Sequence, residues 1–391
     1  MTKTDVLRLA RFTCRCFIAF AGAVALFAQA GTSPLGLFDG NNDVGTVLHK
    51  GAAQFDSSSK TYTITGSGEN VWAAEDDFHF LWKKVSADNV TLAADISILG
   101  TSGDNHRKAL LMIRQSLDPD SPYVDIAAHG DGLTSLQFRD EKGGQTHEIE
   151  SSQYAPKRLQ IEKRHDRFYM WIGPDAHDLQ FAGGSTRLSL SPPYYVGIGV
   201  SAHDKNAIQE AAFSNVDLNT ADKSANDVPA SYSTLETINV QSTDARVSYV
   251  ARAQIEGPVW SPDGASLIFY AAGKPQRVPV SLYISGRPAS AAASVTPEAV
   301  PPEMAPPVTA SNGSDDRDSR ASPDGRQVVF LTYPNDAAND GDVVLSVRSV
   351  ADKKTRVLAK LKGGPGTLSA HPWSPDSKRI AFASYQSFDD Q

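Results

Sequence analysis

The chain has 391 residues, of which 40% are hydrophobic and 21% are charged, and its formal net charge is −8. A chain of this length is expected to form two domains, each large enough to bury a core of its own. The acidic balance argues against nucleic acid and against an anionic membrane surface as partners.

The first thirty residues have the pattern of a secretory signal peptide. Basic residues open the segment, an apolar run extends from Cys16 to Phe27, and residues 28–30 read Ala-Gln-Ala, a cleavage pattern. The run is shorter than the roughly twenty residues that span a bilayer, although an uncleaved anchor is the alternative. Both cysteines, Cys14 and Cys16, lie here, so the mature chain can form no disulfide. We expect a periplasmic or secreted protein that has no membrane span after cleavage of residues 1–30.

Residues 37–218 form a succession of short alternating segments separated by Gly, Asp, Asn and Pro. Residues 61–64, 90–96 and 158–162 are examples, and none of these stretches sustains a helical period. Alternation of period two with frequent turn signals predicts an antiparallel β-sandwich, which we expect to be of the jelly-roll type. Residues 219–233 are polar and predict a linker.

The last third of the chain contains one short phrase three times. An apolar segment with the composition of a strand follows each copy. Proline presets φ and glycine accepts a positive φ, so the phrase predicts a turn that leads into a strand. The copies read Val259-Trp260-Ser261-Pro262-Asp263-Gly264, Ala321-Ser322-Pro323-Asp324-Gly325 and Pro372-Trp373-Ser374-Pro375-Asp376-Ser377.

The spacing of the copies decides what kind of array they form. Their prolines lie 61 and 52 residues apart, whereas a four-stranded propeller blade takes about 40–45 residues and a closed ring needs at least about four blades. Residues 286–320, between the first two copies, are rich in proline and alanine and predict a disordered insert. The sequence therefore predicts an all-β chain, with the sandwich followed by an incomplete β-propeller over residues 234–391.

The repeated phrase and its strand resemble the WD40-like repeats of TolB-type periplasmic β-propellers. Two copies carry Trp260 and Trp373 in matching places, the second has Ala321 there, and the third has Ser377 where glycine is usual. This resemblance implies an exported TolB-like interaction module with an envelope protein as a partner.

The upstream segment looks like a concanavalin-A-like or laminin-G-like domain. That likeness depends on Asp77-Phe78-His79-Phe80-Leu81-Trp82-Lys83-Lys84, on His106-Arg107-Lys108-Ala109 with the apolar run after it, and on Ala128-His129-Gly130-Asp131-Gly132. Domains of this kind often bind glycans and some bind calcium, so the resemblance implies carbohydrate binding, with an envelope polysaccharide as the ligand.

Asp39-Gly40-Asn41-Asn42-Asp43 places oxygen atoms at positions 1, 3 and 5, as a calcium loop does. Val44 stands where an EF-hand has glycine, and Lys50 where it has glutamate. We therefore predict a polar turn here and no metal site. No cofactor is expected, and calcium is left open only by the resemblance.

A ligand site is predicted on one face of the sandwich. An aromatic platform with a few fixed polar groups is what a sugar site requires. The alternative is that the tryptophan lies in the core and the basic residues are solvated strand ends. The candidate ligand-binding residues are Trp82, His106, Arg107, Lys108, Arg114, His129 and Asp131.

No catalytic residues are predicted. The chain has no G-x-S-x-G nucleophile elbow, and its adjacent His–Asp pairs are more typical of turns. Paired carboxylates for glycoside hydrolysis stay open, because their separation is spatial. We expect a non-catalytic exported protein that binds glycan or another envelope polymer through the sandwich. The alternative is a sandwich-type carbohydrate-active hydrolase.

Overall fold

The computed structural model describes residues 35–220, 231–280, 297–299, 319–333, 341–364 and 366–388. The predicted signal peptide, most of the predicted proline-rich insert and the middle of the predicted linker lie outside these ranges. Within them the chain forms strands, turns and loops, and no helix there is long and apolar enough to cross a membrane. The predicted all-β class is confirmed.

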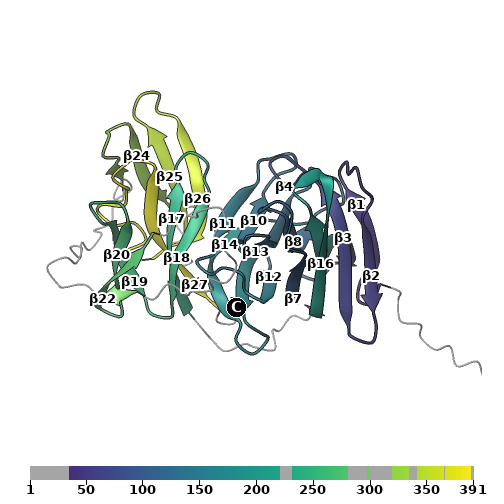
Figure 1. The fold of residues 1–391 in the computed structure, drawn as a ribbon. Coiled ribbons are helices and arrows are strands. Elements are labelled where there is room, and N and C mark those ends of the chain that lie inside the picture. Colours follow the sequence, from purple (N-terminus) through teal and green to yellow (C-terminus); the bar gives the residue numbers. More distant parts are fainter. Residues whose placement is uncertain are drawn as a thin grey trace, which may run out of the picture. The chain divides into compact units, whose positions relative to one another are not determined.

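Residues 40–219 form a β-sandwich of two sheets, which confirms the predicted jelly-roll type (Figure 1). In spatial order, the sandwich part of the first sheet contains β1 (Gly40–Val44), β6 (Phe78–Val85), β15 (Tyr194–Ser201), β8 (Lys108–Arg114), β9 (Tyr123–His129), β10 (Thr134–Arg139) and β11 (His147–Glu150). The second sheet contains β14 (Gln180–Arg187), β13 (Arg167–Gly173), β12 (Arg158–Arg164), β7 (Asn89–Leu99), β16 (Asp204–Asn219), β3 (Thr61–Gly68) and β2 (Ala52–Asp56). Strands β4 (Val71–Trp72) and β5 (Glu75–Asp76) form a separate hairpin.

The alternation of side chains explains most of the core between the sheets. In β12, for example, Leu159 and Ile161 are fully buried in the main apolar cluster. Strand β8 differs, because every residue along it is buried. Its Leu110 and Met112 belong to a second apolar cluster on the other face of the sheet. A continuous apolar run is typical of a strand that is covered on both faces.

Strand β1 shows that the prediction of a polar turn at residues 39–43 is wrong. Gly40–Val44 pairs with β6 in antiparallel register. The polar side chains find partners outside their own segment, so they do not fold the backbone into a turn. Trp82 Nε1 donates to Asn42 Oδ1 at 2.7 Å, and the backbone N–H of Gly51 donates to Asp43 Oδ1 at 3.0 Å.

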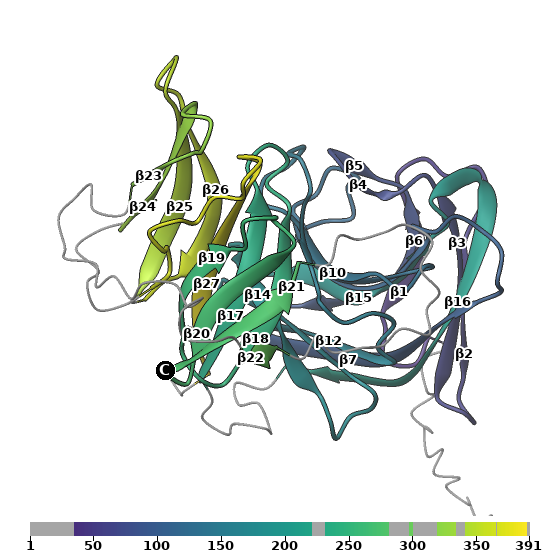
Figure 2. The ribbon, with the colours of Figure 1, turned by 60° about the vertical axis from the view of Figure 1, so that its left-hand side comes forward.

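Each repeated phrase belongs to a different group of strands, and two of these groups are separate four-stranded sheets (Figure 2). Repeat sheet 1 contains β19 (Ile255–Trp260), β20 (Ser266–Ala271), β21 (Lys274–Pro279) and β22 (Glu298–Ala299). Repeat sheet 2 contains β23 (Arg320–Ala321), β24 (Gln327–Thr332), β25 (Asp342–Ser349) and β26 (Thr355–Lys362). Repeat sheet 3 contains β27 (Arg379–Ser387), β17 (Ser231–Asn239), β18 (Ala245–Ala251) and the bridge between Trp373 and Ile380. Whether these sheets represent an incomplete propeller stays a prediction.

The three phrases form the predicted turns, and their hydrogen bonds explain the recurring serine and aspartate. In the first copy, Ser261 Oγ donates to Asp263 Oδ1 at 2.5 Å and accepts from the backbone N–H of Ser266 at 2.9 Å. The other copies repeat both bonds with nearly the same lengths. The glycine position has positive φ in all three, including Ser377 at 59°. The phrase therefore forms a hydrogen-bonded turn that leads into a strand.

The tryptophans of the phrase connect one repeat sheet to the next. Trp260 Nε1 of sheet 1 donates to the carbonyl of Pro372 in sheet 3, at 3.0 Å. Trp373 Nε1 of sheet 3 donates to the carbonyl of Arg320 in sheet 2, at 2.9 Å. Each acceptor directly precedes the tryptophan position of the phrase in the sheet that it belongs to: Pro372 precedes Trp373, and Arg320 precedes Ala321. The hydrogen bonds therefore run from sheet 1 to sheet 3 and from sheet 3 to sheet 2. Sheet 2 has Ala321 at the tryptophan position, and within the described part of the chain no fourth copy of the phrase follows it in space to accept a hydrogen bond from a tryptophan there.

Repeat sheet 3 is continuous with the sandwich. Strand β18 pairs in parallel with β11 at Ile149–Ala245 and Glu150–Arg246, so the first sheet has ten strands in all. Strand β16 ends at Asn219 and β17 begins at Ser231, inside the predicted linker of 219–233. The described residues from 35 onward accordingly form one compact unit.

We predict that Trp373→Phe lowers the free energy of unfolding by about 1 kcal/mol, because it removes one buried hydrogen bond between repeat sheets. Trp171→Phe is the matched control, since Trp171 Nε1 is buried and has no hydrogen-bond partner among the described residues. Urea denaturation of both variants measures the difference. Equal losses would contradict the role of the Trp373 hydrogen bond.

Candidate functional site

Most of the predicted ligand-binding residues lie together at one end of β8 and β9. Lys108 and His129 are paired in register, and the ring of His106 is 5.8 Å from that of His129. The backbone N–H of Gly130 donates to the carbonyl of Arg107 at 2.9 Å. The residues at this end are His106, Arg107, Lys108, His129 and Asp131.

The polar atoms at this end are largely used inside the protein. Lys108 Nζ donates to Asn70 Oδ1 and to the carbonyl of Val71, both at 2.8 Å. Arg107 donates to backbone carbonyls, and Asp131 Oδ1 accepts from the backbone N–H of Leu133. Burial lowers the pKa of Lys108 and holds the pKa of His129 well below its usual value. Of these residues only His106 is partly exposed, so a ligand at this end would meet His106 first.

Arg114 lies at the opposite end of β8 and is fully buried. Its Nη2 is 3.2 Å from Asp76 Oδ2, and Arg139 Nη2 is 2.7 Å from Asp76 Oδ1. Arg114 also donates to the carbonyls of Ser116 and Asp118. The two guanidinium groups and the carboxylate therefore hold the β5 hairpin against the sheet, and they are not displayed to solvent.

Trp82 is partly exposed and belongs to a small aromatic patch, which we define as Asn42, Trp82, Lys84 and Tyr195. The rings of Trp82 and Tyr195 are 5.1 Å apart and nearly perpendicular. Lys84 Nζ lies 5.6 Å from the centre of the Tyr195 ring. Within the described part of the chain, the Tyr195 hydroxyl makes no hydrogen bond. The patch thus combines two aromatic surfaces with polar groups that have capacity for a ligand.

Local sequence explains how Trp82 is presented. Its neighbours in register are Gly40 on β1 and Gly197 on β15. A Cβ atom at Gly40 would lie 2.7 Å from Trp82 Cζ2, so the indole needs a glycine there.

Sequence reasoning identified Trp82 but missed Tyr195. Tyr195 and Lys84 are directly paired across two strands that are distant in the chain.

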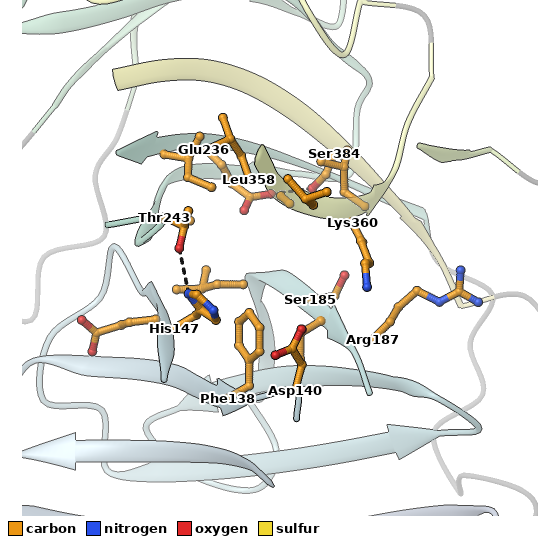
Figure 3. Close-up of a pocket in the computed structure, with 18 of the residues that line it drawn as sticks. Phe138, Asp140, His147, Ser185, Arg187, Glu236, Thr243, Leu358, Lys360 and Ser384 are labelled. Carbon is orange, nitrogen blue, oxygen red and sulfur yellow. Dashed lines mark hydrogen bonds between the residues drawn. The ribbon is translucent and has the colours of Figure 1, made fainter. Parts of the chain in front are cut away.

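A second candidate site is a pocket of about 240 Å³ between the sandwich and the repeat sheets. Strands β10, β11 and β14 line one side, and β17, β26 and β27 line the other (Figure 3). We call it the junction pocket. Its characteristic lining residues are Phe138, His147, Glu236, Leu358, Phe382 and Ser384.

The junction pocket contains one buried carboxyl group in a largely apolar wall. Ser384 Oγ donates to Glu236 Oε1 at 2.6 Å. Burial raises the pKa of Glu236 to about 7, against the lowering effect of the Ser384 hydrogen bond. Across the pocket, His147 Nδ1 is 2.7 Å from Thr243 Oγ1. The sequence offered only a weak signal, an acid two residues before Ile238 in an alternating strand.

We predict that Asp76→Asn lowers the free energy of unfolding by about 3–5 kcal/mol, because it leaves two buried guanidinium groups without a counter-charge. Asp118→Asn removes an exposed ion pair with Lys142 and should cost no more than about 1 kcal/mol. Guanidinium chloride denaturation gives both values. A small loss for Asp76→Asn would show that the network is not structurally important.

The raised pKa of Glu236 predicts a pH dependence of stability. The carboxyl has a pKa of about 7 when folded and 4.5 as its ordinary value. Its contribution is therefore fully present below pH 4.5 and is lost as the pH rises toward 7. We expect Glu236→Gln to gain about 3 kcal/mol relative to the native chain over this interval. Thermal denaturation across the interval, with the exposed Glu210→Gln as control, tests this, and parallel curves for native chain and Glu236→Gln would contradict it.

No family model and no curated protein matches this chain. Among solved structures, a functionally unknown protein from Saccharomyces cerevisiae is 14% identical and the match covers 46% of this chain and 96% of that one, with a TM-score of 0.37. The cellulose induced protein Cip1 is 12% identical over 46% of this chain and 89% of that one, with a TM-score of 0.31. A putative TolB from Agrobacterium tumefaciens is 15% identical over 77% and 99% of the two chains, with a TM-score of 0.18. At these TM-scores the similarities carry no argument, and the description of the fold depends on the strands and their pairing.

Proposed function

We propose that the protein is an exported, non-catalytic binding protein that holds a glycan or another envelope polymer on the aromatic patch of its sandwich. The observation that carries the proposal is the partly exposed pair of Trp82 and Tyr195. Carbohydrate sites combine an apolar or aromatic surface with a small number of placed polar groups. The patch has both components on one face of the first sheet.

The polar groups around the rings match the needs of a sugar. The hydroxyl of Tyr195 can both donate and accept a hydrogen bond, and Lys84 Nζ offers three donors. Lys84 is exposed, so its ammonium group is available to a sugar hydroxyl or to a sugar carboxylate. Asn42 is already engaged by Trp82 Nε1 at 2.7 Å and fixes the orientation of the indole. An aromatic surface held in place by a polar side chain supports the proposal that this patch binds a sugar.

The proposal also includes a location outside the cytoplasm and a protein partner in the cell envelope. The signal-peptide pattern of residues 1–30 supports a periplasmic or secreted location, although these residues lie outside the described ranges. The repeat sheets, with their TolB-like phrases, are proposed to contact an envelope protein while the sandwich holds the polymer.

Binding to an array of immobilised polysaccharides tests the proposal. We predict that Tyr195→Ala lowers retention at least about tenfold, equivalent to about 1.4 kcal/mol, because it removes a ring and a free hydroxyl from the patch. Tyr333→Ala is the matched control, since Tyr333 is 56% exposed and lies in the repeat part of the chain. Trp82→Phe should give an intermediate loss, because a smaller ring remains.

Two results would contradict the proposal. Equal retention of the Tyr195→Ala and Tyr333→Ala variants would remove the patch as the binding surface. Release of reducing sugar from a retained polysaccharide would favour the alternative, a sandwich-type carbohydrate-active hydrolase.

A further inference from the structure

The junction pocket brings an acidic side chain into apolar surroundings. In repeat sheet 3, Glu236 on β17 is directly paired with Phe382 on β27. Leu358 of β26 and Ile149 of β11 contribute further apolar surface to the same pocket. Glu236 is only 4% exposed. Burying a charged carboxylate among such groups is unfavourable unless a partner neutralises it.

The described part of the chain supplies little to neutralise Glu236. Ser384 is its one hydrogen-bond donor there, and it is neutral. Arg187 lines the pocket too, but it forms ion pairs with Asp166 and Asp342. Lys360 carries the remaining positive charge of the lining, and it is not among the groups that shift the pKa of Glu236.

The other titratable groups of the pocket add negative charge. Asp140 and Glu148 line it from the sandwich side, together with His147. Gln137 Nε2 donates to Glu148 Oε1 at 2.9 Å, and His147 is hydrogen-bonded to Thr243. Because Arg187 is already paired, the lining has more carboxyl groups than available cations. A ligand with a positive charge would correct this imbalance.

We propose that the junction pocket binds a small organic cation, an amine with an apolar body, whose ammonium group pairs with the carboxylate of Glu236. The apolar body lies against Phe382, Leu358 and Ile149, and the ammonium donates to the Glu236 oxygen atoms beside Ser384. Charge-assisted hydrogen bonds of this kind are about twice as strong as neutral ones. The ligand thereby supplies the partner that the buried carboxyl lacks.

The volume of the pocket limits the size of the ligand. At about 240 Å³, it exceeds the roughly 150 Å³ of an apolar cavity that admits benzene. It is smaller than the roughly 300–1,000 Å³ typical of sites for drug-sized molecules. One ring with a short aminomethyl group therefore fits, and benzylamine is a suitable probe.

Binding of an ammonium group should displace a proton from Glu236. The carboxyl has a pKa of about 7, so it is partly protonated at neutral pH and must ionise to form the ion pair. We expect the affinity for benzylamine to fall about tenfold for each pH unit below that pKa. An apolar ligand without the amine should show no such dependence.

Titration calorimetry of the mature chain with benzylamine and with benzyl alcohol is the test. We expect benzylamine to bind at least about tenfold more tightly, and Glu236→Gln to abolish that preference. Glu210→Gln removes an exposed carboxyl on the sandwich strand β16, which does not line the pocket, and should leave the preference unchanged. Equal affinity for the two probes, or an unchanged preference in Glu236→Gln, would overturn the proposal.

A second measurement does not depend on any variant. Calorimetry of the native chain in two buffers of different ionisation enthalpy gives the number of protons released on binding. Release of a fraction of a proton near neutral pH is expected for benzylamine, and zero release would overturn the proposal. The Tyr195→Ala variant should bind benzylamine normally, which separates this site from the proposed glycan surface.

Discussion

The pairing of β17 with β27 is the constraint on which the rest of the structure depends. The two strands are joined along their whole length, from Ser231–Ser387 to Asn239–Arg379. Glu236 and Ser384, which meet through this pairing, are 148 residues apart in the chain. The pairing of the two strands therefore closes a long loop of the chain. The entropic cost of closing such a loop grows only slowly with its length. Without this pairing, repeat sheet 3 would not exist and the junction pocket would lose two of its walls.

The same pairing connects the repeat sheets with the sandwich. Strand β17 carries β18 on its other side, and β18 continues the first sandwich sheet through β11. The main apolar cluster accordingly includes Leu159 of the sandwich, Ile238 of β17 and Leu345 of β25. Ion pairs from Arg167 and Arg187 to Asp342 lie across the same boundary. Contacts of this number and kind predict that the described parts of the chain unfold together.

Local features of the fold were predictable from the sequence. The three phrases with Ser261, Ser322 and Ser374 form the expected turns, because their hydrogen bonds are confined to a few adjacent residues. Trp82 lies in a partly exposed patch, and its role as a ligand-binding residue stays a prediction. In each case the decisive interactions are either local or follow from residue type.

Features that depend on distant strands were not predictable. Asp39–Asp43 has the composition of a turn, but β6 provides partners that make residues 40–44 a strand. Arg114 looks like a solvated strand end until Asp76 and Arg139 are placed beside it. The importance of Glu236 depends on which strands cover it. Alternation predicts which residues share a face and does not specify what lies opposite that face.

Differential scanning calorimetry of the protein most directly tests whether the sandwich and the repeat sheets form one cooperative structure. The continuous first sheet and the shared apolar cluster predict a single transition, in which the calorimetric and van't Hoff enthalpies agree. Two separate transitions would contradict this account, because the repeat sheets would then be a module independent of the sandwich and the junction pocket would have no stable walls.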